Sequence, residues 1–144
     1  MSSRPTTVTA ELGLRLVLPD SPSVPVAATI RYDVADPYAV HVSFHTGADG
    51  STVEWSFARQ LLADGATHPV GEGDVNVWPT HRDDRALICL ALSSPSGSAL
   101  FETSLTEVVE FLTRSYSAVP TGSESDFVDL DAELALLLWT DDRE

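Results

Sequence analysis

Two histidines spaced four residues apart, His41 and His45, are the first side chains in the sequence that could bind a metal ion. They belong to a run in which Val40, Val42 and Phe44 alternate with polar residues, the period-two pattern of a half-buried β-strand. Four residues along a strand span about 13 Å at roughly 3.3 Å per residue. One zinc ion cannot bridge that gap, because zinc–nitrogen bonds are near 2 Å. We therefore predict two histidines on the polar face of a sheet and no metal site.

Asp33 and Asp36 could form a carboxylate pair for general acid–base chemistry. Such a pair needs a pocket and a raised pKa on one carboxyl group. Both residues flank a turn before Pro37. Aspartate favours such positions because its side chain hydrogen-bonds to nearby backbone N–H groups. We interpret both aspartates as turn residues.

Nucleophilic catalysis has no better support in the sequence. The single cysteine, Cys89, lies in the apolar run ALICLAL, which predicts a buried thiol rather than an exposed nucleophile. The serines lack the G-x-S-x-G elbow of hydrolases. No P-loop, dinucleotide-binding glycine motif or metalloprotease helix occurs. We assign no catalytic residue and no cofactor, and we expect that the protein is not an enzyme.

The charge of the chain limits its partners. Its formal net charge is −14, with eight arginines and no lysine. Nucleic-acid binding draws most of its affinity from neutralising phosphates, so a strongly acidic domain is a poor candidate for it. Adhesion to anionic lipid is disfavoured for the same reason, and no apolar run approaches the roughly 20 residues that span a bilayer. Without a recognisable signal peptide, we expect a cytoplasmic protein that binds other proteins.

The first two thirds of the chain show the alternation of β-strands. A short helical turn is predicted at residues 59–64, stopped by Gly65. Pro79 is predicted to end the strand that contains Trp78. The run at 85–93 is continuously apolar, which predicts a central strand covered on both faces. The expected strands are residues 7–18, 24–32, 40–45, 53–58, 74–78, 85–93 and 98–103.

The final third changes to a helical period. Leu105, Val108, Val109 and Leu112 fall on one helical face, and Ser104 with Glu107 forms a capping box, which predicts a helix at residues 104–118. A second helix is expected at 129–139, followed by an acidic tail at 140–144. The fold class is therefore α+β: about seven mainly antiparallel strands, then two C-terminal helices, in one domain that spans residues 1–144.

Three large apolar residues are candidates for a protein interface. Trp78 and Trp139 each end a predicted element, where an aromatic side chain can be partly exposed and can anchor a partner. Leu138 belongs to the run ELALLLW, which must cover a core or meet another subunit, because an exposed apolar helix is adhesive. Packing within the monomer is the alternative for each tryptophan. Trp55, in the alternating run VEWSF, is expected in the core.

Long stretches of the sequence resemble the SsgA-like proteins of actinobacteria, and within that family they most resemble the SsgB branch. The resemblance is carried by LRLVLPDSPSVPVAATIRYDVADPYAV, VEWSFARQLLADG, GEGDVNVWP and ALICLALSSPSGSALFE. It is strong over residues 8–115 and weakens after residue 115, where LALLLWTDDRE is less typical.

The resemblance implies a non-enzymatic regulator of sporulation-specific cell division. Members of the family take part in septum-site selection, and the SsgB branch recruits the tubulin-like division protein FtsZ. The resemblance also implies a whirly-like fold, a homotrimer, contacts with other SsgA-like proteins and a concentration at division septa. The competing hypothesis is a single-stranded nucleic-acid-binding protein that uses the sheet face near His41 and Trp55, which the acidic charge opposes.

Overall fold

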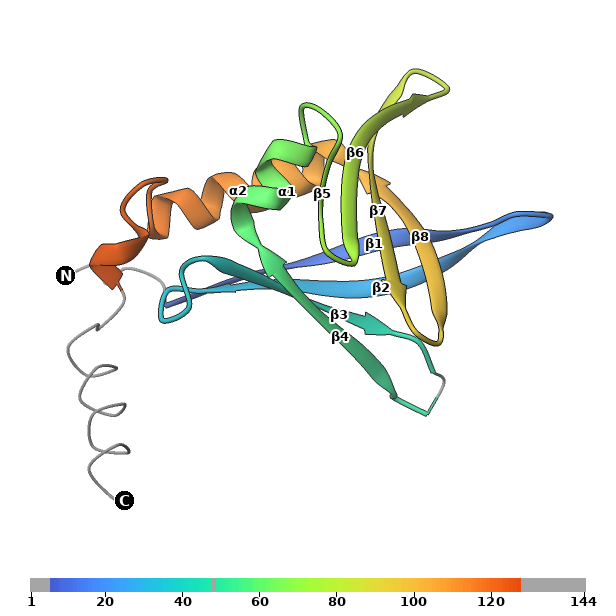
Figure 1. Ribbon diagram of the computed structural model, residues 1–144, viewed down its shortest axis with the longest axis horizontal. Coiled ribbons are helices and arrows are strands. Elements are labelled where there is room, and N and C mark those ends of the chain that lie inside the picture. Colours follow the sequence, from blue (N-terminus) through green and yellow to red (C-terminus); the bar gives the residue numbers. More distant parts are fainter. Residues whose placement is uncertain (1–5, 48, 128–144) are drawn as a thin grey trace.

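The computed structural model describes residues 6–47 and 49–127, and within these ranges eight strands form one antiparallel sheet that curls into a half-barrel (Figure 1). The strand order is β4-β3-β2-β1-β8-β7-β6-β5. The strands are β1 (Thr7–Leu18), β2 (Ser21–Asp33), β3 (Ala39–His45), β4 (Thr52–Ala58), β5 (Val70–Glu72), β6 (Val75–Arg82), β7 (Arg85–Ser94) and β8 (Gly97–Ser104). The helices are α1 (Arg59–Gly65), α2 (Leu105–Ala118) and a 3-10 helix at Glu124–Phe127.

The core lies on the inner face of the curled sheet. Alternation places Leu12, Ile30, Val42 and Phe101 on this face, and the helices α1 and α2 cover it with their own buried side chains. The rings of Phe44 and Phe101 stack with centroids 4.6 Å apart. Strands β3 and β8, which are not neighbours in the sheet, therefore meet in one apolar cluster.

The predicted α+β class with mainly antiparallel strands is confirmed, and so is the helix after the last strand. The hydroxyl of Ser104 accepts a hydrogen bond from the backbone N–H of Glu107 at 3.3 Å, as the capping box predicts. The described residues contain eight strands where about seven were predicted, because β5 has only three residues and is too short to show an alternating pattern. The predicted helix at 129–139 and the acidic tail lie outside the described residues.

The two predictions about Pro79 and β7 were also wrong. Pro79 lies within β6 and pairs with Ile88. β5 pairs with β6 only as far as Val77, so Pro79 occupies a free edge, where a missing N–H is tolerated. β7 is sixth in the sheet rather than central. Its outer-face residues are apolar although no described helix covers that face, so the continuous apolar run has another cause.

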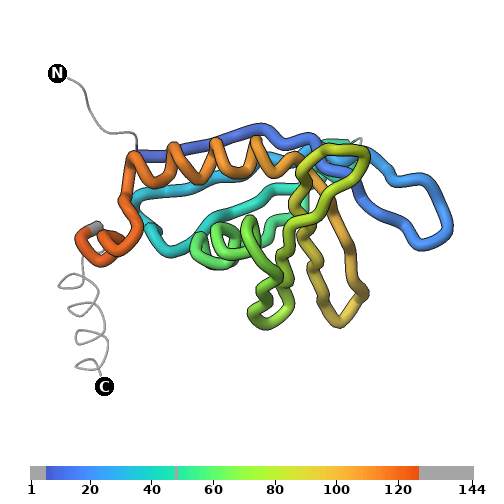
Figure 2. Tube along the Cα trace, turned by 90° about the horizontal axis from the view of Figure 1, so that it is seen from above, coloured from blue at the N-terminus to red at the C-terminus, as the bar shows by residue number. Residues whose placement is uncertain are grey.

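The strands β1 and β8 separate near the middle of the sheet. They pair only at Arg15↔Glu102 and Leu16↔Phe101, and β2 begins its pairing with β3 at Ala27. The end of the β1–β2 hairpin therefore projects beyond its neighbours as a two-stranded arm (Figures 1 and 2). Its outer strand contains Pro22 and Pro25, which cannot donate backbone hydrogen bonds and so protect an exposed edge.

Candidate interaction surface

The histidines of β3 lie on the outer face and hydrogen-bond to neighbouring side chains. His41 contacts the hydroxyl of Ser56 through Nδ1 at 2.7 Å and the carboxylate of Asp36 through Nε2 at 3.0 Å. His45 Nε2 lies 3.0 Å from the hydroxyl of Thr29. In the part of the chain that the structure describes, no group of three or more His, Cys, Asp or Glu side chains is placed to hold a metal ion. The histidines thus link adjacent strands.

Asp33 stabilises the start of the turn between β2 and β3. Its carboxylate accepts hydrogen bonds from the hydroxyl of Thr7 and from Nε of Arg31, both at 3.0 Å. Its backbone carbonyl accepts from the N–H of Asp36 at 2.9 Å. Partial burial acts to raise the pKa of Asp33, but the hydrogen bonds from Arg31 and Thr7 hold it below its usual value. An ionised, bonded carboxylate of this kind is a turn element rather than a general acid.

Cys89 is buried on β7, with 3% of its surface exposed. Burial raises the pKa of its thiol to about 11, and the negative charge of Glu102 acts in the same direction. A thiol with this pKa is protonated at neutral pH and is a poor nucleophile.

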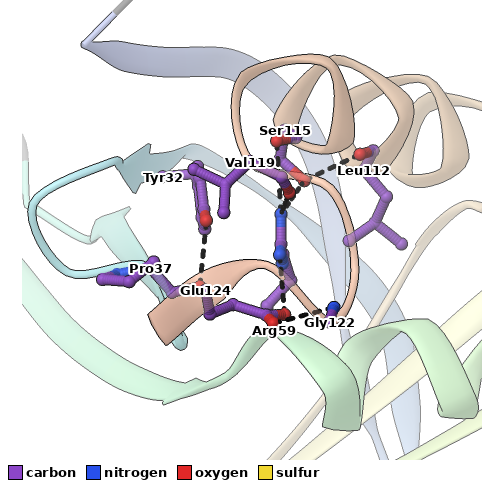
Figure 3. A network of polar contacts seen from close by, with 8 residues as sticks. All are labelled: Tyr32, Pro37, Arg59, Leu112, Ser115, Val119, Gly122 and Glu124. Atoms are coloured by element: carbon purple, nitrogen blue, oxygen red, sulfur yellow. Dashed lines mark hydrogen bonds and ion pairs between the residues drawn. The ribbon is translucent and has the colours of Figure 1, made fainter. Parts of the chain in front are cut away.

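Arg59, the first residue of α1, is a buried cation that sequence reasoning missed. Its Nη1 donates to the carbonyl oxygens of Ser115 and Val119 at 3.2 and 2.9 Å, and to the Ser115 hydroxyl at 3.2 Å. Its Nη2 forms an ion pair with Glu124 at 2.9 Å. Figure 3 shows these bonds converging on the guanidinium group. Arg59 therefore fastens α1 to the end of α2 and to the 3-10 helix.

Two aromatic rings complete the site around Arg59. The guanidinium carbon lies 4.6 Å from the ring centroid of Tyr32 and 4.7 Å from that of Tyr116. The hydroxyl of Tyr32 donates to the carbonyl of Pro37 at 2.9 Å (Figure 3). Among the described residues no buried side-chain nitrogen or oxygen lacks a hydrogen-bond partner, and the guanidinium is enclosed, so the cluster has the character of a structural joint.

Trp78 lies in a shallow apolar trough on the outer face of the sheet. The trough has a volume of about 550 Å³, and its walls come from the end of β1 and from β6, β7 and β8. Trp78 is half-buried beside Cys89, its register partner on β7. This packing explains why β7 is apolar on both faces. The residues that line the Trp78 trough are Leu16, Val17, Leu18, Pro19, Trp78, Ala91, Leu92, Ser93, Ser98, Ala99 and Leu100.

The Trp78 trough opens where β1 and β8 separate. Beyond Leu16, β1 no longer pairs with β8, and the gap between Val17 and Leu100 forms part of the trough. Apolar walls with serines at the margin match the apolar core and polar rim of protein interfaces. Trp78, which was predicted to end a strand, lies inside β6. The other two predicted interface residues, Leu138 and Trp139, lie outside the described residues.

A second hollow, of about 300 Å³, lies on the inner face and contains the half-buried Trp55. Trp55 pairs with the buried Val42, whereas His41 pairs with Ser56. Because adjacent residues of a strand point to opposite faces, Trp55 and His41 do not share a surface. The structure therefore does not bring together the two residues on which a nucleic-acid-binding sheet face would depend.

Among the described residues, no helix is long and apolar enough to cross a membrane.

Comparison with known proteins places these features in a family. Residues 26–124 match the family described as Streptomyces sporulation and cell division protein, SsgA. The sporulation-specific cell division protein SsgB of Frankia casuarinae is 60% identical over 139 residues, which cover 96% of each chain. SsgB of Streptomyces coelicolor is 53% identical over 133 residues, which cover 92% of this chain and 96% of the relative.

Two solved structures share the fold. One, from work on SsgB mutations that correlate with longitudinal cell division during sporulation of Streptomyces coelicolor, has a TM-score of 0.82 and 52% identity and covers 88% of this chain and 99% of its own. The other is an SsgA-like sporulation-specific cell division protein from Thermobifida fusca, with a TM-score of 0.84 and 47% identity; it covers 94% of this chain and 98% of its own.

Proposed function

The chain belongs to the SsgA family of sporulation and cell division proteins, and we propose that it is a non-enzymatic regulator of sporulation-specific cell division. In this role it helps to select septum sites by recruiting or positioning the tubulin-like protein FtsZ. The relatives named SsgB, which match the chain over nearly its whole length, support the role in cell division.

The observation that carries the binding mode is the Trp78 trough. A half-buried tryptophan in an apolar concavity is the kind of anchor around which binding energy concentrates in protein interfaces. The two histidines of the outer face, by contrast, are occupied by hydrogen bonds to neighbouring side chains. We therefore place the contact with the division machinery at Trp78 rather than at the histidines.

We further propose that the protein acts as a homotrimer in the cytoplasm, concentrates at division septa and also contacts other SsgA-like proteins. A trimer presents three copies of the Trp78 trough to a repetitive polymer, so its avidity exceeds the affinity of a single contact. Light scattering coupled to size exclusion should then give a mass three times the 15.5 kDa of one chain. A mass equal to one chain over the whole concentration range would contradict the trimer.

Co-sedimentation with FtsZ polymers tests the recruiting role. We expect the purified protein to pellet with polymers formed in the presence of GTP and to stay in the supernatant with unpolymerised FtsZ. An absence of co-sedimentation, together with unchanged polymer assembly, would refute this role. A mobility-shift assay with single-stranded DNA at low ionic strength tests the alternative, because nucleic-acid binding is strongest when salt is low.

A further inference from the structure

Three of the eight arginines line one pocket of about 350 Å³ on the outer face of the sheet. Arg15 comes from β1, and Arg82 and Arg85 lie on either side of the β6–β7 turn. We call this the arginine pocket; its other walls include Gly13, Glu102 and Ser104. This gathering of arginines is unexpected on a chain whose formal net charge is −14.

The positive charges of the arginine pocket are only partly matched. Arg82 forms an ion pair with Glu102 at 2.7 Å. Arg15 donates to the hydroxyl of Ser23 at 2.9 Å, a neutral partner. Arg85 has neither an ion pair nor a side-chain hydrogen bond with any described residue.

The position of Arg85 is unfavourable for the fold by itself. Arg85 is the register partner of Arg82 at the end of the β6–β7 hairpin. Like charges placed directly opposite each other in antiparallel strands are destabilising, and Glu102 neutralises only one of the two. An anion bound between them would relieve this repulsion.

The arginine pocket also has room for a ligand. Gly13 lies in its wall, and a Cβ atom at this position would meet nothing within 4 Å. The absence of a side chain at Gly13 therefore keeps the pocket open without being needed for backbone geometry or close packing.

We propose that the arginine pocket binds a carboxylate of an acidic peptide segment in a partner protein. Arginine pairs with carboxylate through two parallel N–H···O bonds. Asp83, Glu102 and Glu107 also line the pocket and balance its three arginines in formal charge, so a singly charged carboxylate meets less repulsion there than a doubly charged phosphate. Trp78, Cys89 and Glu102 share the same outer face through their register. An acidic segment in the pocket would thus continue into the Trp78 trough.

The test measures binding of a fluorescein-labelled glutamate hexapeptide by anisotropy near physiological ionic strength, without FtsZ, so that its outcome is independent of the recruiting role. The substitution Arg85→Gln removes the arginine charge that has no ion pair among the described residues. It should weaken peptide binding by about tenfold, as expected for loss of a charged hydrogen bond. Gly13→Val, which fills the pocket without changing any charge, should weaken binding at least as much. Arg31→Gln is the matched control, because it removes the same charge from the same face, away from the pocket, and should bind like the wild type.

Three outcomes overturn the proposal. The wild type shows no binding, or Arg85→Gln and Gly13→Val bind as tightly as Arg31→Gln, or inorganic phosphate displaces the peptide as effectively as free glutamate peptide does. Circular dichroism checks the fold of each variant, and Arg85→Gln, at an exposed position, decides the question if Gly13→Val does not fold.

Discussion

Only 2% of the surface of Arg59 is exposed, and its positive charge is paired with the carboxylate of Glu124 inside the protein. Burial acts to raise the pKa of Glu124, but the hydrogen bond from Arg59 holds it below its usual value. The partners of Arg59 lie 56 to 65 residues further along the chain. No local pattern in the sequence reports such contacts, which is why this cluster was not predicted.

Removing the guanidinium in Arg59→Met should lower the free energy of unfolding by about 3–5 kcal/mol, because Glu124 and two carbonyl groups lose their partner inside the protein. Urea denaturation followed by tryptophan fluorescence measures the change. Arg31→Met breaks the more exposed pair with Asp33 and should cost no more than about 1 kcal/mol. Equal effects of the two substitutions would show that the Arg59 cluster is not a structural joint.

Stability should fall in alkaline solution because two buried groups resist ionisation. Burial raises the pKa of Cys89 from 9.0 to about 11 and that of Tyr32 from 10.0 to about 12, the latter against the opposing charge of Arg59. The folded state therefore holds protons that the unfolded state releases. Stability from these groups is complete below about pH 9 and is lost as the pH rises towards 12.

Thermal unfolding between pH 8 and 12 checks this prediction. In Cys89→Ala the decline should begin about one pH unit higher, near the ordinary pKa of tyrosine, because only Tyr32 remains. A flat profile for the wild type across this range would contradict the burial of both groups.

At the scale of elements, Gly65 shows how a residue can be predicted for the wrong reason. The sequence placed it correctly at the end of α1, as a glycine that stops a helix. Its φ is not positive, so left-handed backbone is not what requires glycine. A Cβ at Gly65 would instead collide with the side chain of Val77 on β6. Gly65 permits α1 to pack closely on the sheet.

Gly65→Ala should therefore lower the stability by about 1–3 kcal/mol, the usual cost of overpacking. Gly13→Ala adds the same methyl group in open space within β1 and should leave the stability unchanged or raise it by about 0.5–1 kcal/mol, because alanine restricts the unfolded chain more. Denaturant midpoints of the two variants give the comparison. A harmless Gly65→Ala would refute the close approach of α1 to β6.

The strands β1 to β4 were predictable because core-facing apolar residues alternate along them with mostly polar residues on the outer face. The prediction that β7 is central was wrong because the outer face of β7 packs beside Trp78. This packing gives β7 the apolar run of a central strand although no second layer of described residues covers it. The prediction that Pro79 ends its strand was wrong because a proline is tolerated where a strand has a free edge. Only the pairing of the strands reveals that β6 has a free edge at Pro79.

At the scale of the molecule, the described residues form a half-barrel divided where β1 leaves β8, and the surfaces proposed to bind partners adjoin this division. Trp78 was identified from the sequence as a possible anchor, but its trough was not, because the trough combines the end of β1 with β6, β7 and β8, which follow much later in the chain. The arginine pocket depends on the same non-local pairing. Composition indicated protein partners, and only the register shows where the two proposed binding surfaces lie on the sheet.

The most direct test of the proposed binding surface measures whether two variants co-sediment with FtsZ polymers. The substitutions Trp78→Thr and Leu100→Asn each change one of two opposite walls of the Trp78 trough. Tyr38→Ala is the control, because Tyr38 is 55% exposed and lies outside the trough. With circular dichroism showing intact folds, both trough variants should bind at least about tenfold more weakly than the wild type, while the control is unchanged. Wild-type binding by both trough variants would contradict the claim that this surface recruits the division machinery.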